Sequence, residues 1–186
     1  MLLASLGYGL AITLFFSLGA PWLRGHLKRM TMALAAVCAL LHLPVPGVSL
    51  LAVLRGALGD LSIVTLVFLT ILFFQGPRSL VPYPRSFALM GLAFFLLSFG
   101  LSPLHLYAWG YAPAVLPCLT GGLAFLLWLR GRRAFSLALL AALVGWRLHW
   151  LDSGNLWDYL LDAPLVMVAL GRAVFLCIAR KPLQAR

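Results

Sequence analysis

Long apolar runs, separated by short segments that carry arginine, lysine or proline, make up most of this chain of 186 residues. Examples are Leu2–Leu23, Leu61–Gln75 and Leu156–Ala179. Hydrophobic residues reach 63% and charged residues only 10%, whereas an average soluble domain has about 45–50% and about 25%. A transmembrane helix needs about 20 predominantly apolar residues. The sequence therefore predicts an all-α, polytopic integral membrane helix bundle with six to seven transmembrane segments, as a single transmembrane domain over residues 1–186.

Basic residues gather in the segments between the apolar runs and give the chain a formal net charge of +10. The positive-inside rule places such clusters on the cytoplasmic side. Eleven of the 14 Lys and Arg residues then face inward: Arg24, Lys28, Arg29, Arg78, Arg85, Arg130, Arg132, Arg133, Arg180, Lys181 and Arg186. This pattern predicts the N-terminus out and the C-terminus in, in a bacterial inner (plasma) membrane. It assigns the basic charge to topology and not to nucleic acid as a partner.

The segment Val48–Asp60 is too short and too polar to span a bilayer. We expect a re-entrant or interfacial helix at residues 48–60. Arg55 and Asp60 lie five residues apart and do not share a helix face. The glycines between them could bend the chain enough for the two side chains to meet in an ion pair.

The densest polar stretch lies at residues 146–162, where two helices are expected to form a hairpin across the turn at Ser153-Gly154-Asn155. Ionisable groups at membrane depth usually pair or serve a pathway. We predict that Arg, Asp and His side chains meet there in an outward-facing polar cup. The candidate catalytic residues, for proton or ion work, are His149, Asp152 and Asp158. The candidate substrate-binding residues are Arg55, Arg147, Asp60, Asp162 and Arg172.

Two other interpretations of this stretch stay open. In the structural one, Arg147 pairs with an aspartate, and Asp152 or Asn155 caps a helix. In the other, the histidine and aspartates hold a metal, joined by His105. No spacing matches a known metal motif, and Cys38, Cys118 and Cys177 lie in separate apolar runs, which argues against a disulfide framework or a zinc site. The sequence thus predicts no metal site, and the cofactor is unknown.

The stretch Leu54-Arg55-Gly56 to Asp60-Leu61-Ser62 resembles a segment in the membrane domains of sulfatase-type phosphoglycerol and phosphoethanolamine transferases, over fewer than ten residues. This resemblance implies envelope lipid or glycan chemistry. Arginine suits bidentate contact with phosphate or carboxylate.

The predicted function is a small multi-pass inner-membrane protein of envelope metabolism, whose cup binds an anionic or lipid-linked head group. Membrane lipid would be its partner. One alternative is a non-catalytic partner subunit that stabilises a larger membrane enzyme or transporter, and another is a small permease. Whether the chain is an enzyme is left open.

Overall fold

The computed structural model describes residues 2–19, 26–45, 47–75, 84–98, 106–112 and 114–179. These residues form an all-α fold of about ten helices, with one short two-stranded hairpin. The helices are α1 (Leu2–Gly19), α2 (Leu27–Leu41), α3 (Leu50–Leu58), α4 (Ile63–Gln75), α5 (Pro84–Ser98), the 3-10 helix η3 (Leu106–Tyr111), α6 (Val115–Leu129), α7 (Arg133–Arg147), α8 (Leu156–Leu160) and α9 (Ala163–Ala179). The strands are β1 (Pro44–Val45) and β2 (Val48–Ser49), and they pair antiparallel.

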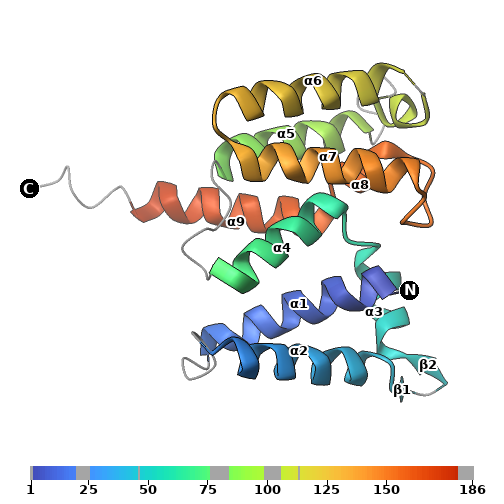
Figure 1. Ribbon diagram of the computed structural model, residues 1–186, viewed down its shortest axis with the longest axis vertical. Coiled ribbons are helices and arrows are strands. Elements are labelled where there is room, and N and C mark those ends of the chain that lie inside the picture. The colour runs from blue at the N-terminus through green and yellow to red at the C-terminus, as the bar shows by residue number, and fades with distance from the viewer. Residues whose placement is uncertain are drawn as a thin grey trace, which may run out of the picture.

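Helices α1, α2 and α3 form one end of the molecule, with the β-hairpin at their edge (Figure 1). Ser49 starts α3, because its side-chain oxygen accepts a hydrogen bond from the backbone N–H of Ala52. Tyr8 on α1 is buried, and its hydroxyl donates to the backbone carbonyl of Gly59. Burial, followed by the charges of Asp60 and Asp162, raises the pKa of Tyr8 to about 12. The neutral phenol therefore ties α1 to the end of α3.

Helix α4 crosses between this end and the remaining helices, and it packs against both α1 and α7 (Figure 1). On the other side of α4, helices α6 and α7 form a pair, and α5 packs against α9. The α6–α7 pair is close because Ala124 and Ala138 are fully buried small residues. Ser136 on α7 also donates a hydrogen bond of 2.7 Å to the carbonyl of Ala124. The main core lies between α4, α7, α8 and α9.

The lengths of the observed helices contradict the prediction of a polytopic membrane bundle. Within the ranges that the structure describes, no single helix is both long and apolar enough to cross a membrane. Among the described helices, only the pair of α3 and α4 meets the requirement together, and these two helices are bent by 120°. The predicted six to seven transmembrane segments, the N-out and C-in topology and the multi-pass inner-membrane location are therefore wrong.

The error comes from counting apolar residues across breaks in the helices. The run Leu156–Ala179 was expected to be one span, but it divides into α8, with 5 residues, and α9, with 17. The break falls at Leu161, whose backbone is extended with φ of −136° and ψ of 138°. The division expected between residues 48–60 and 61–75 is present, because α3 ends before Gly59, whose φ is 78°, and α4 begins at Ile63. Hydropathy alone does not register such breaks.

Candidate functional site

Arg55 is held between two carboxylates. Its Nε lies 2.6 Å from Asp60 Oδ1, and its Nη2 lies 2.7 Å from both Asp60 Oδ2 and Asp152 Oδ2. The left-handed backbone of Gly59 turns the chain so that Asp60 returns to Arg55. Hydrogen bonding from Arg55 lowers the pKa of the exposed Asp152 carboxyl. The predicted ion pair of Arg55 with Asp60 is confirmed, and Arg55 is thereby occupied by acids of this chain.

Asp158, in the first turn of α8, is bound by hydroxyl groups. Tyr107 on η3 lies within 3.1 Å and 3.2 Å of its two carboxylate oxygens, and Ser153 donates a further hydrogen bond. Burial, and then the charge of Asp158, raises the pKa of Tyr107. Both hydroxyls therefore donate to Asp158, which joins η3 to the turn before α8.

Asp162 is buried, with 7% of its surface exposed. Its Oδ1 accepts a hydrogen bond of 2.6 Å from the backbone N–H of Leu165, which is the capping contact for the start of α9. Its Oδ2 accepts one of 2.7 Å from the backbone N–H of Ser62. Each oxygen of this carboxylate thus satisfies a backbone donor.

Arg147 and His149 are exposed, and the side chain of neither forms an ion pair or hydrogen bond with another described residue. His149 has a positive φ of 53°, just after the end of α7. The predicted pairing of Arg147 with an aspartate is therefore not found in the described chain, since Asp152 pairs with Arg55. The cap by Asn155 is confirmed, because its side chain accepts from the backbone N–H of Trp157 at 2.9 Å.

Arg172 lies apart from these groups, ten residues after Asp162 on α9, or about 15 Å along the helix. It is half-buried, and its Nε is buried with no hydrogen-bond partner among the described residues. His105 lies outside the described residues. Nowhere in the described ranges do three His, Cys, Asp or Glu side chains come together in a way that could hold a metal ion. The residues of the predicted cup thus do not form one site. Most of their polar groups are paired with each other or with the backbone.

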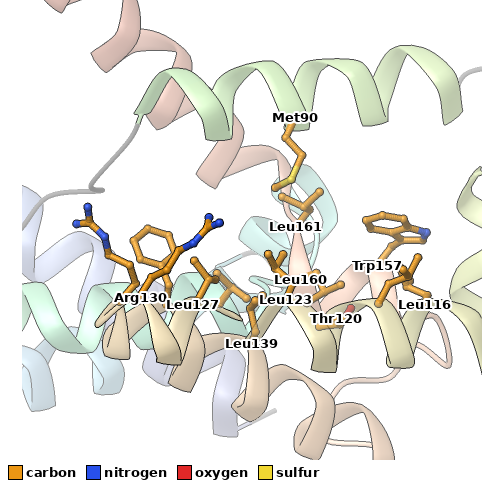
Figure 2. A pocket seen from close by; sticks show the side chains of 14 residues that line it. Met90, Leu116, Thr120, Leu123, Leu127, Arg130, Leu139, Trp157, Leu160 and Leu161 are labelled. Atoms are coloured by element: carbon orange, nitrogen blue, oxygen red, sulfur yellow. The ribbon is translucent and has the colours of Figure 1, made fainter. Parts of the chain in front are cut away.

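A pocket of about 610 Å³ is the better candidate site. One wall is a row along α6, and α4, α5, α7 and α8 supply the rest. Figure 2 shows Met90 reaching from α5 towards Leu161, opposite the α6 row that ends at Arg130. The lining residues are Val64, Met90, Leu116, Leu119, Thr120, Leu123, Leu127, Arg130, Arg132, Phe135, Leu139, Trp157, Leu160 and Leu161.

Polar groups are few in this pocket, and they have distinct places. Arg130 and Arg132 follow the last residue of α6, so the two positive charges lie at that end. Trp157 lies towards the other end (Figure 2), and its indole N–H donates to the carbonyl of Leu106 at 2.8 Å. Among the described lining residues there is no carboxylate, histidine, cysteine or serine. The geometry is that of a largely apolar pocket with a cationic end.

Sequence reasoning missed this pocket because it assigned Arg130 and Arg132 to membrane topology. A signal was present in the spacing of Leu116, Thr120, Leu123, Leu127 and Arg130. Steps of four and three residues place all five on one face of a helix. A mostly apolar stripe along one helix face, ending in arginine, was the sequence pattern that indicated this pocket.

Comparisons of the chain with protein-family models, with curated proteins and with solved structures give no match. The short resemblance at residues 54–62 therefore does not extend to a family. The site has to be interpreted from its own chemistry.

Proposed function

We propose that this protein binds a long-chain acyl carboxylate, with the chain in the pocket between α5, α6, α7 and α8 and the carboxylate at Arg130. The single observation that carries this proposal is the position of two arginines at one end of a largely apolar pocket of about 610 Å³. Small-molecule pockets usually enclose about 300–1,000 Å³ and combine apolar walls with a few placed polar groups.

The walls favour a hydrocarbon chain. Leu123, Leu127, Leu139 and Leu160 offer no hydrogen bond, so a polar ligand would lose its contacts with water and gain none. Each buried methylene group contributes about 0.8 kcal/mol. Contact with the walls would thus strengthen as the chain lengthens.

The length of the pocket supports one acyl chain. From Leu116 to Arg130 the α6 row rises through fourteen residue steps, or about 21 Å at 1.5 Å per step. One leaflet of a bilayer's hydrocarbon core, which is one acyl chain deep, is roughly 15 Å thick. A single extended chain therefore fits along α6 with its head group at the arginines.

The charged end favours an anion. Arg130 is exposed and directly follows α6, and a guanidinium can bind a carboxylate through two parallel hydrogen bonds. This ligand class agrees with the anionic or lipid-linked head group expected from the sequence, but the site differs from the predicted cup. The partner-subunit and permease alternatives stay predictions.

The test is a calorimetric titration of the purified protein with octadecanoate, below the concentration at which this ligand forms micelles. We expect octadecanoate to bind, octadecanol to bind more weakly and acetate not to bind. Arg130→Gln should weaken octadecanoate about tenfold or more, because a hydrogen bond to a charged group contributes about 1.5–3 kcal/mol. It should leave octadecanol unchanged.

Matched variants at nearby positions of the chain serve as controls. Arg133→Gln removes an equal charge from the same turn, but Arg133 stacks over Trp128 at 5.8 Å and does not line the pocket. Leu139→Trp fills the pocket, whereas Leu137→Trp adds the same bulk to an exposed position of α7. Equal losses in each pair, or no binding of octadecanoate to the unmodified protein, would overturn the proposal.

A further inference from the structure

Thr120 is the one uncharged hydroxyl-bearing side chain among the described residues that line the pocket. It lies on α6 between Leu116 and Leu123, and Figure 2 shows it on the pocket wall near Leu160. Leucine at this position would complete the apolar row. A hydroxyl here therefore calls for an explanation in terms of what the pocket holds.

The hydroxyl of Thr120 has no hydrogen-bond partner among the described residues. Threonine in a helix commonly donates to the carbonyl of the residue three or four positions earlier. Thr70 does so, with Oγ1 2.8 Å from the carbonyl oxygen of Leu66, and Thr31 does so with Lys28 at 2.9 Å. Thr120 does not form this bond, although only 5% of its surface is exposed. The fully buried side-chain atoms that lack a partner among the described residues do not include this hydroxyl, which is therefore open to the pocket that Thr120 lines. A plain hydrocarbon chain would cover the hydroxyl and leave it without a partner, which is unfavourable. A ligand that supplies a hydroxyl at this point avoids that cost.

The position of Thr120 defines where that ligand must be polar. Thr120 precedes Arg130 by ten residues, which is about 15 Å along α6. Both residues line the same pocket. A chain whose carboxylate contacts Arg130 would therefore pass Thr120 well away from its head group.

We infer that the pocket selects a long-chain hydroxycarboxylate, with Thr120 as the residue that recognises the chain hydroxyl. This inference rests on the proposed function, because it assumes that the carboxylate binds at Arg130. Thr120 acts here as a specificity-determining residue and contributes to binding alone. Its hydroxyl can donate to or accept from the ligand hydroxyl, so either orientation of the ligand group is satisfied.

The experiment compares octadecanoate, 12-hydroxyoctadecanoate and 2-hydroxyoctadecanoate by calorimetric titration. The unmodified protein should bind the 12-hydroxy ligand about three- to tenfold more tightly than octadecanoate, which is the range for one net hydrogen bond. The 2-hydroxy isomer should show no such gain, because its hydroxyl lies beside the head group. Thr120→Val should abolish the preference without weakening octadecanoate, and Thr120→Ser, which keeps the hydroxyl, should retain it.

The outcomes separate this inference from the proposed function. If octadecanoate and the 12-hydroxy ligand bind equally well, or if Thr120→Val keeps the preference, the pocket still binds acyl carboxylates and this inference is overturned. If none of the three ligands binds, the proposed function fails together with it. An equal gain for the 2-hydroxy isomer would also overturn the role of Thr120.

Discussion

The carboxylate of Asp162 accepts a hydrogen bond of 2.7 Å from the backbone N–H of Ser62, which lies 100 residues earlier in the chain. Both groups are buried. The same carboxylate caps α9 through the N–H of Leu165. One side chain therefore fixes the start of α9 against the segment that leads into α4.

Replacing Asp162 tests whether its role is structural or functional. Asp162→Ala leaves two backbone N–H groups without their acceptor, and we expect the free energy of unfolding to fall by about 3 kcal/mol. Asp162→Asn keeps one amide oxygen as an acceptor and should lose about half as much. Denaturant unfolding followed by circular dichroism measures both. Unchanged stability together with lost octadecanoate binding would contradict the structural role. It would instead support the prediction that Asp162 binds substrate.

The ion pair of Arg55 with Asp152 predicts a small dependence of stability on pH. Arg55 holds the pKa of Asp152 below its ordinary value of 3.8 in the folded state, so the carboxylate stabilises the fold above that pH. The contribution is lost as the pH falls below 3.8 towards the lowered pKa. The unmodified protein should therefore exceed Asp152→Asn in unfolding midpoint at pH 6, and the two should converge in acid. A constant gap across the range would contradict the ion pair as its cause, and added salt should narrow the gap at pH 6.

Gly110 on η3 lies against the fully buried side chain of Asn155. A methyl group on Gly110 would lie 1.6 Å from Asn155 Oδ1 and 2.7 Å from Trp157 Cδ1. Gly110→Ala should therefore destabilise the protein by about 1–3 kcal/mol, the usual cost of overpacking. Thermal unfolding measures the loss. Gly122→Ala is the control, because nothing lies within 4 Å of the added methyl group, and it should be neutral or slightly stabilising. Equal effects of the two changes would contradict the close approach.

Two local features of the polar residues could be predicted from the sequence. Arg55 and Asp60 are close in the chain, and the glycines between them are the residues that allow the necessary turn. Asn155 is a common first residue before a helix, and its contact with Trp157 spans only two residues. Both predictions depend on neighbours in sequence, where spacing and residue type carry enough information.

Contacts across the fold could not be predicted in this way. His149 was expected beside Asp158 and Asp162, but those two acids are bound by Tyr107 and by the backbone of Ser62. Nothing in the composition around residue 162 points to residue 62. The α6 face of the pocket was visible as a stripe, yet its opposite wall needs Met90 of α5, which only the packing brings near. Hydropathy also overstated the spans, because it sums residues on both sides of a helix break.

Helix α4 touches α1 on one side and α7 on the other, and Val64 and Phe68 belong to the main core. Leu66 on α4 and Leu61 just before α4 lie against Gly7 of α1. Deleting the first three helices would therefore remove the packing on one side of α4 and expose leucines that are now buried. The chain should consequently unfold in a single cooperative transition, and a fragment that begins at α4 should aggregate when it is expressed alone.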